Sequence, residues 1–255
     1  MEFALSFLCA LLASWMTFYS GFGLGTLLMP IIALFFPLPI AIGFTAIVHL
    51  FHNLVKTGIL WKAIDWKVAF KFGITALLGA ILGALLLKKL SFLTPFKEYS
   101  FFSIHGKISV LGILIGLLIL FFATWEMFFS QTRFKVKNLF LGGAISGFFG
   151  GLSGNQGAFR SAYLVNMNLD TRSFIATNAI IATVVDVIRL IIYTRSFGNL
   201  LKEINPSLLV STLIAAFLGI CLGMIFIKKI TIHLVQKAIF VLLYLLGILF
   251  IAGII

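Results

Sequence analysis

Apolar runs long enough to cross a membrane recur along this chain from one end to the other. Each run holds about 17–25 residues, and a helix of that length spans a hydrocarbon core roughly 30 Å thick. The chain is 62% hydrophobic and only 10% charged, whereas soluble domains are roughly 45–50% apolar and about 25% charged. We therefore expect an all-α integral membrane protein, because backbone groups in lipid must be paired within helices.

The charged breaks between these runs define about eight candidate transmembrane helices. The candidates cover residues 3–36, 39–60, 68–87, 108–129, 139–165, 171–193, 206–227 and 232–255. The first and the fifth are too long for one simple helix. No connecting stretch is long enough for a soluble catalytic domain. The first residues, Met1-Glu2-Phe3, carry no positive region before the apolar run, so we expect the first segment to be retained.

Short motifs recur at a nearly constant distance, which indicates an internal duplication. The matched positions, 132 or 140 residues apart, are Gly25 and Gly157, Thr45 and Thr177, Gly79-x-x-x-Gly83 and Gly219-x-x-x-Gly223, and the lysine pairs 88–89 and 228–229. We predict two homologous four-span halves, residues 1–130 and 131–255, each beginning with a glycine-broken long helix. Secondary transporters commonly have this construction, with the site between the halves. Whether the repeats are parallel or inverted stays open.

Glycines interrupt the first and fifth apolar runs at matched places. We call residues 21–25 the first glycine break and residues 150–157 the second. Glycine weakens a helix, and backbone groups freed at membrane depth need protein, water or a ligand as partner. A half-helix that begins there directs free N–H groups into the cavity, which suits an anion. We expect Gly23, Gly25 and Gly157 to line a substrate site, and the two Gly-x-x-x-Gly pairs to serve helix packing.

The second glycine break is the more polar one. Asn155, Gln156 and Arg160 follow one another within a single apolar run. An arginine at bilayer depth costs at least about 2.5–3.5 kcal/mol and by default marks function. Its planar fork of donors matches the oxygens of an oxoanion or a carboxylate. We therefore expect Arg160 to bind the charge of an anionic solute, with Asn155 and Gln156 as orienting donors.

The run that follows the second break adds further candidates. Thr45, Thr177 and Asn178 are expected to line the same cavity, although a threonine hydroxyl often bonds to its own helix backbone. Asp186 and Arg189 are three residues apart and share a helical face. They form either a structural ion pair or a proton-coupling pair.

The second span has a polar stripe of its own. His49, Asn53 and Lys56 recur at helical spacing on one face. We list His49 and Asn53 as secondary lining candidates, with hydrogen bonding between helices as the equal alternative.

Three stretches resemble the sulfite exporter TauE/SafE permeases. They are Gly21-x-Gly23-x-Gly25 with Pro30, the stretch from Gly150 to Ser161 with its Gly-Asn-Gln-Gly core, and Phe174-Ile175-Ala176-Thr177. The resemblance covers almost the whole chain and implies a permease for small anions such as sulfite, sulfonates or related organosulfur and carboxylate anions. By position in that pattern it implies lining roles for Gly25, Thr45, Asn155, Gln156, Gly157, Arg160 and Thr177. The chain departs from the pattern at Leu24 and Ala162.

The charge of +12 fits basic loops beside anionic lipid headgroups, so the expected partners are the bilayer and a small anion, not nucleic acid. No metal site, cofactor or catalytic residue is predicted, and a homo-oligomer stays open. We expect a multi-pass protein of a cell membrane, the inner or plasma membrane of a prokaryote. Counted over eight single crossings, basic loop residues balance at eight on each side, so the orientation is unresolved.

Two other functions compete with a carrier. A passive anion channel would have the same composition, although paired breaks fit alternating access better. Gly151-Leu152-Ser153-Gly154 and His49-x-x-x-Asn53 resemble rhomboid intramembrane serine proteases. That family's base histidine follows the serine, and the only later histidine here is His233, at the edge of a span. The sequence therefore favours a transporter over an enzyme.

Overall fold

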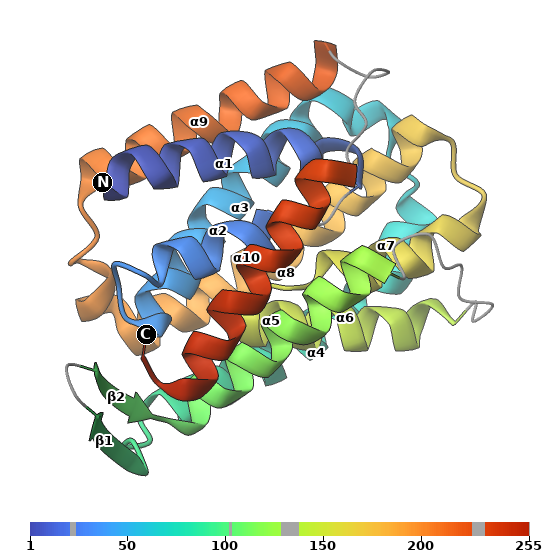
Figure 1. Cartoon of the computed structure of the whole chain (residues 1–255). Coiled ribbons are helices and arrows are strands. Elements are labelled where there is room, and N and C mark those ends of the chain that lie inside the picture. The colour runs from blue at the N-terminus through green and yellow to red at the C-terminus, as the bar shows by residue number, and fades with distance from the viewer. Residues whose placement is uncertain (21–23, 102–103, 129–137, 226–232, 255) are drawn as a thin grey trace.

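The computed structural model describes residues 1–20, 24–101, 104–128, 138–225 and 233–254, which form a helical bundle with one small hairpin (Figure 1). In chain order the elements are α1 (Glu2–Ser20), α2 (Leu24–Ile32), α3 (Leu38–Leu60), a 3₁₀ turn (Trp61–Ala63), α4 (Trp66–Ser91), β1 (Lys97–Phe101), β2 (Ile104–Ile108), α5 (Val110–Phe128), α6 (Leu139–Ser153), α7 (Gly157–Leu164), a second 3₁₀ turn (Val165–Met167), α8 (Thr171–Leu201), α9 (Pro206–Ile225) and α10 (His233–Ala252). The predicted all-α fold is confirmed.

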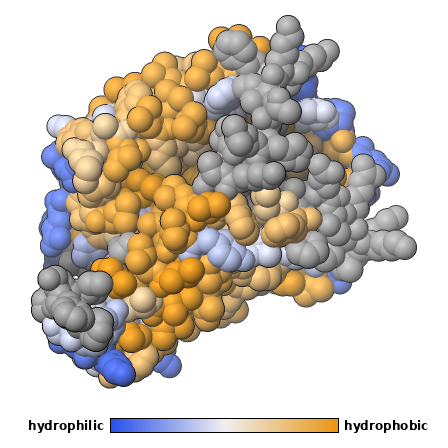
Figure 2. Space-filling model, in the orientation of Figure 1, coloured by the Kyte–Doolittle hydropathy of each residue, from blue (hydrophilic) through white to orange (hydrophobic). Residues whose placement is uncertain are grey.

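Within these residues, four helices are long and apolar enough to cross a membrane: α3, α4, α8 and α9. Shorter apolar helices, α1, α5, α6 and α10, occupy the other predicted spans. Large apolar side chains such as Leu78 and Leu82 on α4 are exposed, and Figure 2 shows a broad apolar surface with hydrophilic residues gathered towards its ends. Such a surface belongs in lipid. The count of eight spans stays a prediction.

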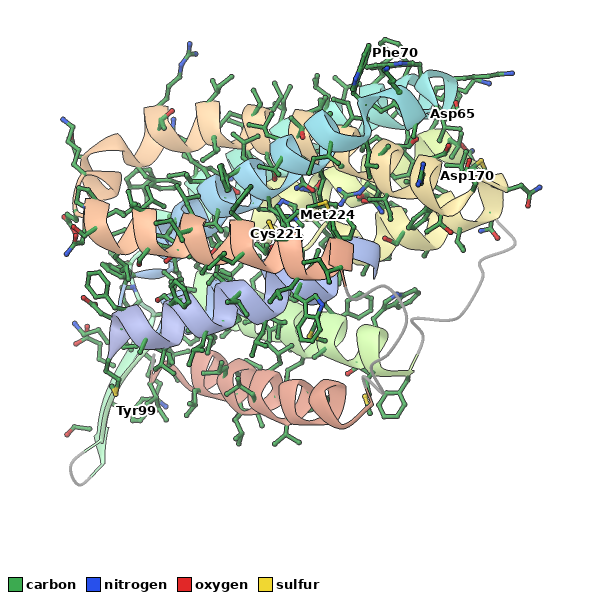
Figure 3. The ribbon with its side chains drawn as sticks, turned by 90° about the horizontal axis from the view of Figure 1, so that it is seen from above. Asp65, Phe70, Tyr99, Asp170, Cys221 and Met224 are labelled. Atoms are coloured by element: carbon green, nitrogen blue, oxygen red, sulfur yellow. The ribbon has the colours of Figure 1, made fainter. Side chains whose placement is uncertain are left out.

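The molecule has two polar ends (Figure 3). Asp65 and Asp170 lie at one of them, and Tyr99 lies on the β-hairpin at the other; we call them the Asp65 end and the hairpin end. The hairpin is tied to the bundle where the Tyr99 hydroxyl donates to the carbonyl of Ala252 at 2.7 Å. At the Asp65 end, the carboxylate of Asp65 accepts the Val68 N–H at 3.0 Å and caps α4.

Both overlong predicted runs are split at their glycine breaks. The first becomes α1 and α2, with residues 21–23, and hence the candidate Gly23, outside the described residues. The second becomes α6 and α7, and α7 runs back along α6, since the Ser146 hydroxyl donates to the carbonyl of Gln156 and Gly142 faces the ring of Tyr163. α6 ends at Gly154, whose φ of 85° is left-handed and favours glycine.

The Gly-x-x-x-Gly pairs serve close helix packing, as predicted. A Cβ on Gly79 would collide with the backbone of Ala144, and one on Gly83 with the backbone of Phe148, so α4 lies directly on α6. On the other side of the bundle, Gly219 lies against the backbone of Leu11, and α9 lies on α1 in the same way. Removing side chains from both surfaces lets helix backbones approach this closely.

These contacts connect the two predicted halves. Each Gly-x-x-x-Gly helix packs on the first helix of the other half, while α3 packs on α8 and α5 on α10. Both of the latter pairs are antiparallel: the Asp65 N–H, just beyond α3, bonds to Thr177 near the start of α8, and Gly112 at the start of α5 faces Phe250 near the end of α10. We propose that the two halves are inverted repeats, supported by this exchange of equivalent contacts.

Candidate functional site

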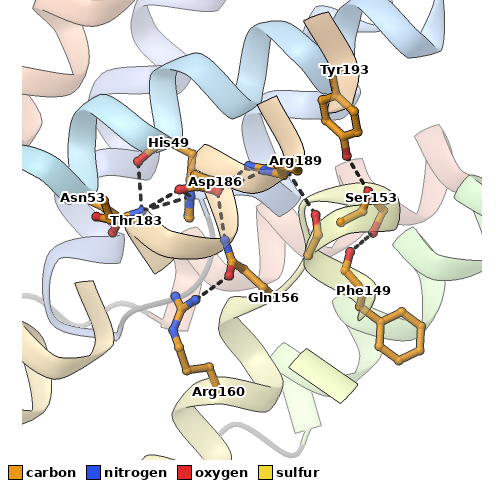
Figure 4. Close-up of polar contacts among 12 residues, drawn as sticks. His49, Asn53, Phe149, Ser153, Gln156, Arg160, Thr183, Asp186, Arg189 and Tyr193 are labelled. Atoms are coloured by element: carbon orange, nitrogen blue, oxygen red, sulfur yellow. Dashed lines mark hydrogen bonds and ion pairs between the residues drawn. The ribbon is translucent and has the colours of Figure 1, made fainter. Parts of the chain in front are cut away.

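A network of buried polar side chains lies between α3, α7 and α8 (Figure 4). We call it the polar network; its members are His49, Asn53, Gln156, Arg160, Asn178, Asp186 and Arg189. Every one is almost completely removed from the surface. Buried polar groups need hydrogen-bond partners and buried charges need opposite charges, so the contacts of each member decide what it can do.

Asp186 on α8 is the centre of the polar network. One carboxylate oxygen lies 2.6 Å from Nδ1 of His49 and accepts from the Asn53 amide at 3.3 Å. The other accepts from Gln156 Nε2 at 3.0 Å and from Arg189, whose Nη2 lies 2.9 Å away in an ion pair. Each carboxylate oxygen of Asp186 therefore has two hydrogen-bonding or ion-pair partners. The predicted Asp186–Arg189 pair is present, and its alternative role in proton coupling stays open.

Arg160 on α7 contacts two neutral amide side chains. Its Nη1 donates to Gln156 Oε1 at 2.7 Å, and its Nε donates to Oδ1 of Asn178. The Asn178 amide in turn donates to the Ser161 hydroxyl at 3.1 Å. Hydrogen bonds to amides orient a guanidinium and do not neutralise its charge. Gln156 also joins Arg160 to Asp186, because its two amide atoms bind one each.

Side chains of α8 satisfy the backbone at the second glycine break. The carbonyl of Gly150 accepts from Arg189 Nη1 at 3.3 Å, and that of Gly151 accepts from the Tyr193 hydroxyl at 2.6 Å. These carbonyls lie in the last turn of α6, where helix carbonyls often lack donors, although that of Gly150 also accepts the N–H of Gly154 at 3.0 Å. Side chains of α8 therefore hold the end of α6. α7 begins at Gly157 without a side-chain cap among the described residues.

The two glycine breaks are in contact. A Cβ on Gly25, in the first turn of α2, would lie 2.8 Å from the carbonyl oxygen of Gly154 and 3.8 Å from Asn155 Oδ1. Only glycine allows this approach. Asn155 is 3% exposed, and among the described residues neither its Oδ1 nor its Nδ2 has a hydrogen-bond partner. An orphaned amide in a buried position calls for an explanation such as a ligand.

The family model described as "Sulfite exporter TauE/SafE" matches residues 6–250. The chain belongs to the sulfite exporter TauE/SafE family. It is therefore a membrane transporter of a family that exports sulfite and related anions. No curated protein and no solved structure matches the chain.

Not every predicted residue of this TauE/SafE member lies in the polar network. The Thr177 hydroxyl accepts the N–H of Asp65 at 2.9 Å and so holds the connection between α3 and α4. Thr45 is buried, and its hydroxyl has no hydrogen-bond partner. Gly25 and Gly157 lie at the starts of α2 and α7. His49 and Asn53 belong to the network and hydrogen bond across to α8.

Sequence reasoning missed several contributors to the site. Ser146 hydrogen bonds to the second glycine break, and Ser161 hydrogen bonds to Asn178. Tyr193 hydrogen bonds to the end of α6. Tyr193 stands four residues after Arg189, so helical spacing could have indicated it. Ser153, the residue of the protease motif, donates to the carbonyl of Phe149 at 3.1 Å in its own helix. His49 meanwhile binds Asp186 through Nδ1, so these contacts do not pair the serine with a base.

Proposed function

We propose that this TauE/SafE member is a secondary transporter for small oxygen-bearing anions, sulfite, sulfonates or related organosulfur and carboxylate anions. The anion binds where the two glycine breaks meet. Arg160 binds its charge, Asn155 and Gln156 orient it, and the N–H groups at the start of α7 add donors. The membrane is the inner or plasma membrane of a prokaryotic cell, and the protein acts without a cofactor.

The observation that carries this proposal is the unpaired amide of Asn155. A buried polar group without a hydrogen bond costs about 1–3 kcal/mol, so its retention at the contact between the breaks needs a compensating role. The amide has one donor group and one acceptor, and it adjoins Gln156 and the start of α7. An oxoanion bound there would accept hydrogen bonds from the Asn155 Nδ2 atom and from the α7 backbone.

Charge supports the same solute. Of the buried ionisable side chains that the structure describes, Lys56, Arg160 and Arg189 are cationic and Asp186 is the one carboxylate. Asp186 is saturated by its own partners. Cations buried in a medium of low dielectric constant are costly until an anion joins them. The site therefore fits an anionic solute and disfavours a cationic one.

Counterflow of labelled sulfite in proteoliposomes tests the proposal. Saturable exchange, accelerated by unlabelled sulfite on the opposite side, is expected from a carrier. Sulfate, thiosulfate, sulfonates and small carboxylates are then added in turn, and the order of their inhibition constants identifies the preferred anion. Empty liposomes, and proteoliposomes with Arg160→Ala, are the controls. No flux of any anion through the wild-type protein would refute the proposal.

A passive anion channel is separated from a carrier by the same assay. Flux through a channel is not accelerated by solute on the far side. The contact between the two breaks favours the carrier, because both breaks close on one buried position instead of lining an open pore.

A further inference from the structure

A lysine is buried where α3 packs beside the end of α1. Lys56 lies one turn before the C-terminus of α3 and is 1% exposed. Its Nζ donates to the carbonyl of Thr17 at 3.4 Å, near the limit for a hydrogen bond, and lies 5.5 Å from the centre of the Phe18 ring. Neither neighbour neutralises an ammonium, and no ion pair joins Lys56 to a carboxylate within the described part of the chain.

Lys56 lies next to the polar network. Asn53 of the network is three residues before it on the same face of α3, and His52 is four residues before it. His52 Nε2 lies 3.3 Å from the carbonyl of Ser14, while its buried Nδ1 has no hydrogen-bond partner in the part of the chain that the structure describes. Asn53 donates to Asp186 at 3.3 Å, so Lys56 lies one turn of α3 from a residue that contacts the centre of the polar network.

The packing contacts align the two halves of the chain. Leu11 on α1 faces Gly219, and Ala144 on α6 faces Gly79 in the same way. Leu11 and Ala144 are therefore equivalent positions, 133 residues apart. In α3 and α8 the matched threonines, Thr45 and Thr177, are 132 residues apart, so Lys56 of α3 lies one position from the equivalent of Arg189 of α8.

The equivalent positions differ in one respect that matters for charge. By the same match, Asn53 lies one position from the equivalent of Asp186. In α8 the cation is matched by the carboxylate three residues before it. In α3 the residue three before the cation is a neutral amide, which itself donates to Asp186. Lys56 therefore has no carboxylate partner among the described residues, whereas Arg189 has one.

We infer that Lys56 is a second cationic anchor for the transported anion and that, together with Arg160, it makes the site selective for doubly charged small oxoanions over singly charged ones. The three buried cations exceed the one buried carboxylate by two charges within the described residues, and a dianion such as sulfite cancels that excess. This inference rests on the proposed function, since it assigns the substrate class of the same site.

Competition against sulfite counterflow at a fixed near-neutral pH tests the inference, with sulfate as the dianion and methanesulfonate as the monoanion. The wild-type protein should be inhibited by sulfate at lower concentration than by methanesulfonate. In Lys56→Met that preference should fall at least tenfold, while Lys56→Arg and the exposed control Lys62→Met keep it. No dianion preference in the wild type, or an unchanged preference in Lys56→Met, would overturn the inference.

A charge-restoring variant covers the case in which Lys56→Met fails to reconstitute. Lys56→Cys is made with Cys9 and Cys221, the cysteines of the chain, replaced by alanine. Modification with aminoethyl methanethiosulfonate restores a positive charge and should restore the dianion preference, whereas methyl methanethiosulfonate should not. Equal preference after both reagents would refute the role of Lys56. Absent wild-type flux would instead refute the proposed function, and Arg160-dependent flux with no effect of Lys56 would refute this inference alone.

Discussion

Gly25 and Asn155 are distant in the sequence and adjacent in the structure: a Cβ on Gly25 would lie 3.8 Å from Asn155 Oδ1. Gly25 opens α2 and Asn155 lies in the link between α6 and α7. The contact joins the two glycine breaks, and it places the orphaned Asn155 amide at their junction. From this arrangement the roles of single residues can be tested one at a time.

Asn155→Ala should impair anion exchange without destabilising the protein, because the amide has no hydrogen bond to the described residues that it could lose. We expect the KM for sulfite to rise about tenfold, as for one lost hydrogen bond to a charged ligand. Gln156→Ala is the matched comparison: it removes bonds to Asp186 and Arg160 and should lower the thermal unfolding temperature in detergent as well. If Asn155→Ala unfolded as early as Gln156→Ala, Asn155 would have a structural role.

Arg160→Ala should lower sulfite exchange by tenfold to a hundredfold, since a charge-assisted hydrogen bond contributes about 1.5–3 kcal/mol. Exchange is measured in proteoliposomes with equal amounts of reconstituted protein. Arg195→Ala, which removes an exposed arginine from the same chain, should leave exchange unchanged. Normal saturation kinetics in Arg160→Ala would exclude Arg160 from the site.

Asp186→Asn should destabilise the fold by about 3–5 kcal/mol, because Arg189 is left buried without its counter-charge. Unfolding in detergent is the measurement. The double variant Asp186→Asn with Arg189→Met should be more stable than the single one, since no unpaired charge remains. The double variant also separates the two roles of Asp186: transport that no longer depends on pH would indicate proton coupling, and an unchanged pH dependence would indicate a structural ion pair.

Gly83→Ala should destabilise the protein by about 1–3 kcal/mol, the usual cost of overpacking, because the added Cβ meets the backbone of Phe148 and lies 2.8 Å from Leu152 N. Gly73→Ala in the same helix is the control, as nothing lies within 4 Å of its Cβ. It should be neutral or stabilising by up to about 1 kcal/mol through helix propensity. Equal unfolding temperatures of the two variants would contradict the tight α4–α6 interface.

Asp170 gives a pH-dependent contribution at the polar start of α8. Hydrogen bonds from the backbone and hydroxyl of Ser173 lower the pKa of the Asp170 carboxyl. A lowered pKa means that the stabilisation is present above the unfolded-state pKa and is lost as pH falls through the folded one. Asp170→Asn keeps the acceptor and should abolish this acid-dependent loss, measured as unfolding temperature against pH. The same acid dependence in both proteins would show that Asp170 does not contribute.

The sequence was sufficient to predict the all-α membrane fold and the places where the long runs break, because length, apolarity and glycine act locally. It could not show that the chain turns back after each break, since the residues of a returning helix such as α7 form a helix equally well when it continues in the same direction. The equal number of basic loop residues on the two sides of the membrane followed from the assumption that each predicted run crosses the membrane once. In the structure Lys62 and Arg172 lie at the Asp65 end, although the count put them on opposite sides, and Lys88 and Arg195 lie together at the hairpin end.

The sequence also could not show which side chains of the site contact one another. Asn178, a predicted lining residue, accepts a hydrogen bond from Arg160. Its neighbour Thr177, also predicted to line the site, instead bonds to the α3–α4 connection. The two residues differ by one helical position, about 100° around the axis, and only packing decides which one faces inward. Lys56 was seen as part of a stripe, but its lack of a carboxylate partner depends on residues from α1 and α8 that no local pattern connects.

The glycine contacts also determine which parts of the protein move as rigid bodies. The backbones of α4 and α6 are in direct contact, and so are those of α1 and α9. This close packing opposes movement of one helix of a pair along the other. Each pair takes one helix from either half of the chain. Opening the site alternately to the two sides of the membrane therefore requires one mixed pair to tilt against the other, so the mechanical units of this transporter cut across the units of its duplication.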